Sequence, residues 1–194
     1  MIKFSNSRDK QVQLRIIGRG GQGILTLGKI IGTIFFQMGY AVTLIPRYGA
    51  ERRGAKIFVD LRISSQEIRD KSLLEIVSHL FVLDYGVLGL DDINLLSSNG
   101  IIVIKDYQLR PRYKTILKKE LQIFLLDESK IDDISTLKFT NELFLLILPK
   151  IFTEIQIKDI EQYFQKTYSN KSFISKINSL SNELIKKVKI EDYI

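Results

Sequence analysis

Gly18-Arg19-Gly20-Gly21-Gln22-Gly23 lies between an apolar run, residues 12–17, and a segment with helical spacing that begins at Ile24. Read in order, these are a strand, a glycine turn and a helix. Glycine permits positive φ and lets another backbone or a ligand approach closely, and a helix N-terminus favours an anion. The spacing predicts a nucleotide- or phosphate-binding turn. Its candidate ligand-binding residues are Gly18, Gly20, Gly21, Gln22 and Gly23, and the alternative is a tight turn that binds nothing.

The next strand argues against an ordinary NAD site. A dinucleotide site needs an acidic residue about 20 residues after the glycines to hold a ribose hydroxyl. Here the predicted strand at 41–45 is followed by Pro46 and Arg47, and no acidic residue comes before Glu51. A basic residue at that place suits a phosphate, or a carboxylate of a partner protein, better than a ribose.

The stretch from Pro46 to Gly54 is the second informative segment, because it combines three arginines with an aromatic residue and two glycines. A loop at the carboxyl end of a parallel strand lies where open α/β sheets bind ligands, and paired arginines grip phosphate or carboxylate groups. The alternative is a solvated basic turn in which the glutamate pairs with an arginine. The candidate ligand-binding residues here are Tyr48, Glu51, Arg52, Arg53 and Gly54.

The remaining pattern predicts an α/β fold with a mostly parallel sheet, flanking crossover helices and a helical C-terminal segment. Apolar alternation or short apolar runs predict strands at 12–17, 41–45, 56–63, 80–84, 101–104 and 123–127. Helical spacing predicts helices at 23–38, 137–149, 157–168 and 173–188. The chain shows no internal repeat and no low-complexity linker, so we expect a single domain over residues 1–194.

Four further residues have two interpretations each. Gly28 and Gly32 lie four apart on the first predicted helix, which favours close packing against a neighbour over local flexibility. Asp84 ends a predicted strand, where capping of the next turn is commoner than ligand contact. His79 precedes the same strand, and a lone histidine there is more often structural than catalytic.

Composition excludes several classes of function. The chain carries a formal net charge of +7, but the excess is spread over both halves and does not form a basic tail, so we expect no nucleic-acid partner. It has no cysteine and a single histidine, so we expect no iron–sulfur or zinc site and no other metal site within it. The first residues show no signal-peptide pattern, and no apolar run approaches the ~18 residues of a membrane span. We therefore expect a soluble, cytoplasmic protein without a membrane partner.

The two informative stretches together resemble a known family. Gly18-Arg19-Gly20-Gly21-Gln22-Gly23 followed by Tyr48-Gly49-Ala50-Glu51-Arg52-Arg53-Gly54-Ala55 is similar to the gamma subunit, or gamma domain, of 2-oxoacid:ferredoxin oxidoreductases. The pyruvate and 2-oxoisovalerate enzymes are the nearest types, and the similarity is clearest over residues 14–63. Many members have a second glycine where this chain has Ala55, and alanine there favours the pyruvate type.

The resemblance implies a Rossmann-like gamma-type catalytic domain that is not active alone. It implies partner chains, the alpha, beta and delta subunits, which carry thiamine diphosphate, magnesium and iron–sulfur clusters. The complex would oxidatively decarboxylate a 2-oxoacid to an acyl-coenzyme A and pass the electrons to ferredoxin. Coenzyme A would suit the glycine turn and the arginine loop, whereas no individual catalytic residue is implied.

Two alternatives remain open from the sequence. The chain could be a stand-alone nucleotide- or phosphate-binding regulatory module that uses the same glycine turn. It could also be mainly an assembly scaffold, in which the arginine loop pairs with carboxylates of another subunit.

Overall fold

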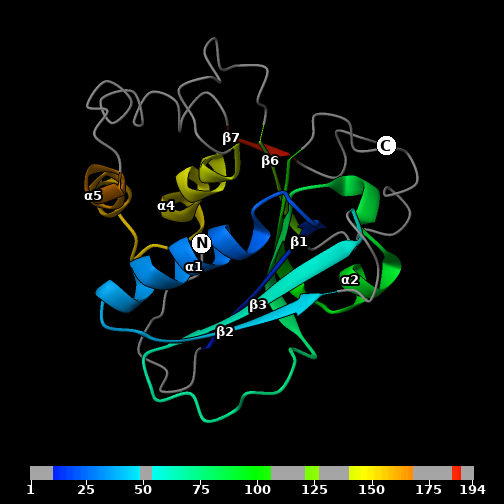
Figure 1. Ribbon diagram of the computed structural model, residues 1–194, viewed down its shortest axis with the longest axis horizontal. Coiled ribbons are helices and arrows are strands. Elements are labelled where there is room, and N and C mark those ends of the chain that lie inside the picture. The colour runs from blue at the N-terminus through cyan, green and yellow to red at the C-terminus, as the bar shows by residue number, and fades with distance from the viewer. Residues whose placement is uncertain (1–10, 49–53, 106–120, 127–139, 168–184, 189–194) are drawn as a thin grey trace.

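The computed structural model describes residues 11–48, 54–105, 121–126, 140–167 and 185–188. Its first strand, the glycine turn and its first helix follow one another in the predicted order (Figure 1). In chain order the elements are β1 (Val12–Arg19), α1 (Ile24–Gln37), β2 (Ala41–Tyr48), β3 (Lys56–Ser64), β4 (Val77–Val82), η1 (Tyr85–Val87), α2 (Leu90–Asn94), β5 (Leu96–Ile104), β6 (Gln122–Leu126), η4 (Thr140–Ile147), α4 (Leu148–Ile151), α5 (Ile157–Thr167) and β7 (Ile185–Val188).

The described strands form one sheet of seven strands in the order β2-β3-β1-β4-β5-β6-β7. The α/β class is confirmed, but the sheet is mixed and not mostly parallel. β1, β4, β5 and β6 are parallel neighbours, whereas β3 is antiparallel to both β1 and β2. The reason is the short connection between β2 and β3, since strands joined by a short turn pair antiparallel and only a long crossover allows parallel pairing.

The insertion of β3 still leaves β2 running in the same direction as β1. Arg19 at the end of β1 pairs with Lys56, and Tyr48 at the end of β2 pairs with the adjacent Ile57. The carboxyl ends of β1 and β2 therefore lie at the same edge of the sheet, as the sequence predicts. β2 extends three residues beyond the predicted strand and includes Pro46, which an edge strand tolerates because its missing N–H need not pair.

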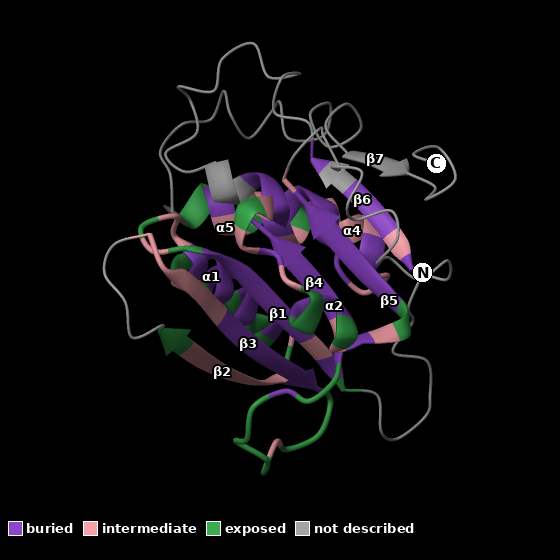
Figure 2. Ribbon diagram, turned by 90° about the vertical axis from the view of Figure 1, so that its right-hand side faces the viewer, coloured by how far each residue is buried: buried purple, intermediate pink, exposed green. Residues whose placement is uncertain are grey.

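Two apolar clusters cover the two faces of the sheet. α1, η4, α4 and α5 pack on one face, and α2 with the residues after η1 packs on the other (Figure 1). Figure 2 shows that the central strands are buried and that β2 at the edge is half-buried. None of the helices in the described segments is long and apolar enough to cross a membrane.

Gly28 and Gly32 bring α1 close to the sheet, which confirms the packing interpretation. A Cβ on Gly28 would lie 3.0 Å from Cγ1 of Val59, and one on Gly32 would lie 3.3 Å from Cγ1 of Val42. This close approach fixes α1, and with it the glycine turn at its start, against β2 and β3.

The C-terminal prediction is partly wrong. α5 confirms the helix predicted at 157–168, but residues 185–188, predicted as helical, form β7, which pairs antiparallel with β6. The sequence of β7, Ile-Lys-Lys-Val, is compatible with a helix or a strand. It forms a strand here because its backbone can pair with the unpaired N–H and C=O groups at the edge of β6. The rest of that predicted helix, up to residue 184, lies outside the described residues.

A buried ion pair lies on the face of the sheet opposite α1. Arg15 donates to the two carboxylate oxygens of Asp60 over 2.7 Å each, and its guanidinium carbon lies 4.3 Å from the centre of the Phe58 ring. Asp60 also accepts a hydrogen bond from the backbone N–H of Leu74 over 3.3 Å. The pair therefore fastens the connection between β3 and β4 to the sheet.

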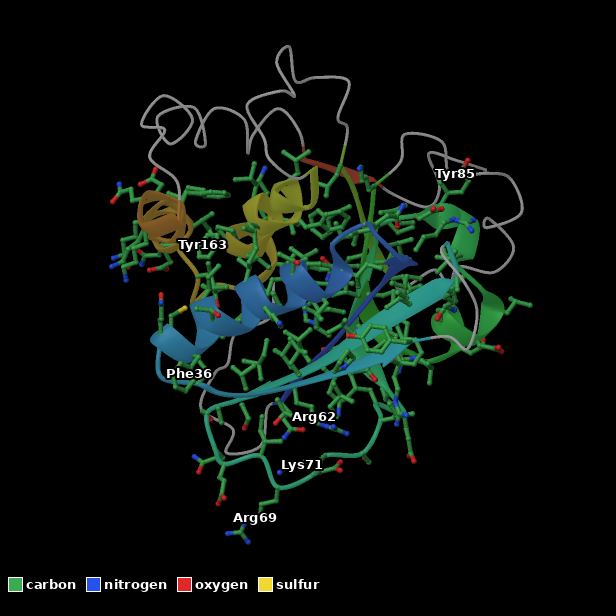
Figure 3. The ribbon with its side chains drawn as sticks, in the orientation of Figure 1. Phe36, Arg62, Arg69, Lys71, Tyr85 and Tyr163 are labelled. Atoms are coloured by element: carbon green, nitrogen blue, oxygen red, sulfur yellow. The ribbon has the colours of Figure 1, made fainter. Side chains whose placement is uncertain are left out.

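Arg62 fastens the same connection one step further along. Its buried guanidinium donates to the Ser72 carbonyl and to the carboxylate of Asp70. Arg62 lies against the sheet in Figure 3, whereas Arg69 points away from it. The connection is thus held by two arginines of the sheet, while its own Arg69 faces solvent.

Candidate functional site

The candidate site lies at the carboxyl edge of β1 and β4, where the glycine turn meets two other segments. The backbone N–H of Gly20 donates to the Ala55 carbonyl over 3.1 Å, and Nη1 of Arg19 donates to the Gly54 carbonyl over 3.2 Å. The two stretches that the sequence singled out are therefore in direct contact through their described residues.

Arg19 also joins the turn to the segment after β4. Its Nε lies 2.7 Å from Oδ2 of Asp84, and the other oxygen of that carboxylate accepts the N–H of Gly86 over 2.8 Å. Asp84 is the N-cap of η1, which confirms the capping prediction. Arg19 is a site residue that the glycine spacing does not predict, although an arginine inside a glycine turn is the signal that could have indicated it.

Gln22 closes the same cluster from within the turn. Its Oε1 accepts the backbone N–H of Arg19 over 2.7 Å, and its Nε2 donates to Oδ2 of Asp84 over 3.3 Å. Partial burial alone would raise the pKa of Asp84. The hydrogen bonds from Gly86, Arg19 and Gln22 outweigh burial and hold that pKa below its usual range. Asp84 is therefore ionised at neutral pH.

The glycines of the turn have different surroundings. A Cβ on Gly18 would lie 2.7 Å from Oε1 of Gln22, and one on Gly86 would lie 3.0 Å from Nη2 of Arg19. Those two glycines make room for the protein's own side chains. By contrast, no atom of the described residues comes within 4 Å of a Cβ placed on Gly21 or Gly54, and both have φ of 94°. Among the described residues, the open side of the turn is therefore that of Gly21, and Gly54 in the adjoining segment is open as well.

The N-terminus of α1 faces the turn without a side-chain cap. Gly23 is the N-cap residue, with φ of 74°, and makes no side-chain cap hydrogen bond to the first turn of α1. That turn contains no acidic residue either. Its N–H groups and the positive end of the helix dipole thus remain suited to an anion.

Of the remaining predicted site residues, the structure describes only some. Tyr48 ends β2 and is 63% exposed, and it lies at the same edge as the turn. Glu51, Arg52 and Arg53 lie outside the described residues. Their role as ligand-binding residues stays a prediction.

A second ion pair at this edge was not predicted from the sequence. Nζ of Lys56 contacts Oδ2 of Asp92, which is buried and also accepts the N–H of Gly89 over 2.8 Å. Lys56 is the neighbour of Arg19 in the β1–β3 ladder. The two ion pairs together tie η1 and α2 to the edge. Within the described ranges, no three His, Cys, Asp or Glu side chains gather as a metal site would require.

His79 lies inside the sheet and not in the site. It is fully buried, its Nδ1 lies 2.8 Å from Oγ of Ser78, and its ring centre lies 4.7 Å from that of Phe152. Oγ of Ser78 also donates to the Gln13 carbonyl, so its single proton is used and Nδ1 of His79 must be the donor. Nε2 finds no hydrogen-bond partner within the described structure. The structural interpretation of this histidine is the one that its surroundings favour.

Acid should destabilise the protein through His79. Burial lowers its pKa to about 3, whereas in the unfolded chain it titrates near 6.5. Between these values the unfolded state binds a proton that the folded state does not, so stability is complete above pH 6.5 and falls as the pH decreases. From pH 7.5 to pH 5.0 we expect a loss of about 2 kcal/mol in the free energy of unfolding, measured by urea denaturation.

His79→Phe is the control for this prediction, because Phe packs against Phe152 and leaves both hydrogen bonds between Ser78 and Gln13 in place. The variant should lose most of the pH dependence above pH 5. An equal loss of stability in the variant and the wild type would show that other groups cause it.

Comparison with known proteins gives a consistent assignment. Residues 13–181 match the model of the family described as pyruvate ferredoxin/flavodoxin oxidoreductase. The common subunit gamma of the pyruvate/ketoisovalerate oxidoreductases of Pyrococcus furiosus is 30% identical over 161 residues, which are 81% of this chain and 87% of that subunit.

Two solved structures share the fold. The pyruvate oxidoreductase subunit PORC of Thermotoga maritima superposes with a TM-score of 0.74 at 22% identity, over 93% of this chain and all of that one. A chain of the 2-oxoglutarate:ferredoxin oxidoreductase of Magnetococcus marinus gives a TM-score of 0.67 at 18% identity, over 93% of this chain and 32% of that one. The fold is therefore that of an α/β subunit or domain of oxoacid oxidoreductases.

The family match assigns the chain more specifically than the shared fold does. The chain belongs to the pyruvate ferredoxin/flavodoxin oxidoreductase family, and within it corresponds to the gamma subunits. The resemblance seen in the glycine turn and the arginine loop is confirmed.

Proposed function

We propose that this chain is the gamma subunit of a pyruvate, or related 2-oxoacid, ferredoxin oxidoreductase. The complex oxidatively decarboxylates the 2-oxoacid, forms an acyl-coenzyme A and passes electrons to ferredoxin. The observation that carries the proposal is the family match over residues 13–181, together with similarity across 87% of a gamma subunit common to pyruvate and ketoisovalerate oxidoreductases.

The chain works with alpha, beta and delta partner subunits in this proposal. Iron–sulfur clusters are held by cysteine thiolates, and the sequence has no cysteine. The clusters accordingly belong to the partner chains, and the family resemblance assigns thiamine diphosphate and magnesium to them as well. A cytoplasmic location of the complex and a single domain over residues 1–194 stay predictions.

Coenzyme A is the ligand that we assign to the open side of the glycine turn. Gly21 and Gly54 leave space there, and the uncapped N-terminus of α1 favours a phosphate group. The related 2-oxoglutarate enzyme of Magnetococcus marinus was solved with coenzyme A and succinyl-CoA bound. The predicted residues Gly20, Gln22 and Gly23 shape the turn in this assignment, while Tyr48, Glu51, Arg52 and Arg53 stay candidates for contacts from the adjoining loop.

Co-purification tests the subunit assignment. A tagged copy of the chain, purified without oxygen from its own cells, should bring down partner chains that contain thiamine diphosphate and iron–sulfur clusters. The eluate should then be brown and show the visible absorbance that is typical of iron–sulfur clusters. A colourless chain recovered alone, under conditions that preserve such complexes, would instead favour the stand-alone nucleotide-binding module.

A further inference from the structure

We propose that Arg19 is a positioning residue, which holds the coenzyme A side of the glycine turn in shape and does not bind the ligand's phosphates itself. The inference rests on the proposed function of the turn. It assigns to Arg19, with Asp84 as its partner, a role that the spacing of the glycines does not show.

The donors of Arg19 are directed at the protein itself. Nε donates to Asp84 over 2.7 Å and Nη1 to the Gly54 carbonyl over 3.2 Å. Nη2 lies close to Gly86, 3.0 Å from the position that a Cβ on this glycine would occupy. One guanidinium thus contacts the segment before β3 and the segment after β4. The planar fork of arginine suits this task, because it presents donors in fixed directions.

The rest of the cluster fits around the contact between Arg19 and Asp84. Gln22 accepts the N–H of Arg19 and donates to Asp84, so one carboxylate ties together both side chains of the turn. A Cβ on Gly86 would lie 3.0 Å from Nη2 of Arg19, and one on Gly18 would lie 2.7 Å from Oε1 of Gln22. These two glycines therefore leave room for the cluster as it stands.

The charge of Asp84 also disfavours a phosphate at Arg19. Asp84 is ionised and lies in contact with the Arg19 guanidinium, so a phosphate that approached Arg19 would meet a carboxylate of like charge. Gly21 and the first turn of α1 carry no such acidic group. The anion is expected at Gly21 and the first turn of α1, and Arg19 fixes the backbone that receives it.

The test uses the assembled oxidoreductase complex with variants of this chain. Arg19→Met removes the contacts to Asp84 and Gly54, and Asp84→Asn removes the charge that orients Arg19. Each should raise the KM for coenzyme A by about tenfold, as expected for the loss of ~1.4 kcal/mol of positioning. The KM for the 2-oxoacid and the kcat at saturating coenzyme A should change little. A general loss of folding or assembly would instead lower the kcat as well.

The double variant separates positioning from direct binding. If Arg19 and Asp84 act as one unit, Arg19→Met with Asp84→Asn should be no worse than either change alone. If Arg19 bound a phosphate, Asp84→Asn would free its charge and lower the KM for coenzyme A, and that result would overturn the inference. Complexes that fail to assemble with both single variants would also overturn it, in favour of a role in subunit contact.

Two controls distinguish failure of the inference from failure of the proposed function. Arg69→Met removes a highly exposed arginine and should leave both KM values unchanged. Gly21→Asn places a side chain on the open side, and asparagine tolerates positive φ better than most residues. If Gly21→Asn raises the KM for coenzyme A and Arg19→Met does not, the inference about Arg19 is wrong and the site remains. If neither variant changes this KM, the assignment of coenzyme A to the turn is wrong.

Discussion

Asp60→Ala should lower the free energy of unfolding by about 3–5 kcal/mol, the usual cost of leaving one member of a buried ion pair without its partner. Arg15 and Asp60 are only 5% and 1% exposed. Without the carboxylate, Arg15 keeps a buried charge whose nearest remaining acceptor is the Leu74 carbonyl at 3.4 Å. The N–H of Leu74 loses its acceptor as well, so the connection between β3 and β4 should loosen.

Urea denaturation of the isolated chain measures this effect. The control replaces both charges with apolar residues, Arg15→Met with Asp60→Leu, and should recover much of the stability, since a packed apolar pair often substitutes well for a buried ion pair. Glu67→Ala breaks the exposed pair of Glu67 with Arg69 and should shift the midpoint little. A loss no larger for Asp60→Ala than for Glu67→Ala would mean that water reaches Arg15 freely.

The sequence predicts the start of the fold well because the signals there are local. An apolar run, a turn rich in glycine and a helix with one apolar face dictate β1, the turn and α1 with little help from the rest of the chain. The same holds for the contact of the turn with Gly54, because both segments follow strands that end at one edge of the sheet.

The order and direction of the strands could not be predicted in the same way. An alternating strand such as β3 pairs equally well in either direction, and nothing local shows that it lies between β1 and β2. β7 depends on the free edge of β6, which is a property of the assembled sheet. The predictions of a mostly parallel sheet and of a helix through residues 185–188 failed for this reason.

The candidate site shows the same division. Glycine spacing indicates the turn, but the partners of Arg19 and Lys56, Asp84 and Asp92, lie 65 and 36 residues away in sequence. Such pairings follow from the strand order and have no sequence signature of their own. The open space beside Gly21 and Gly54 likewise depends on the folded arrangement of the segments around them.

Omission of this chain should reduce the activity of the oxidoreductase complex to background. The family assignment makes the chain one subunit of a complex in which other subunits would carry the iron–sulfur clusters and thiamine diphosphate. Neither this chain alone nor the partner chains without it should therefore perform the full reaction. In the proposed arrangement the partners keep the redox groups but lack the turn that we assign to coenzyme A.

The direct measurement is dye reduction that depends on both 2-oxoacid and coenzyme A, with the alpha, beta and delta partner chains assayed with and without this chain. We expect no activity from this chain alone, background activity from the partners alone, and full activity when the folded chain is added back. A chain unfolded before addition is the control and should restore nothing. Full activity of the partners without this chain, or 2-oxoacid oxidation by this chain alone, would contradict its assignment as the gamma subunit.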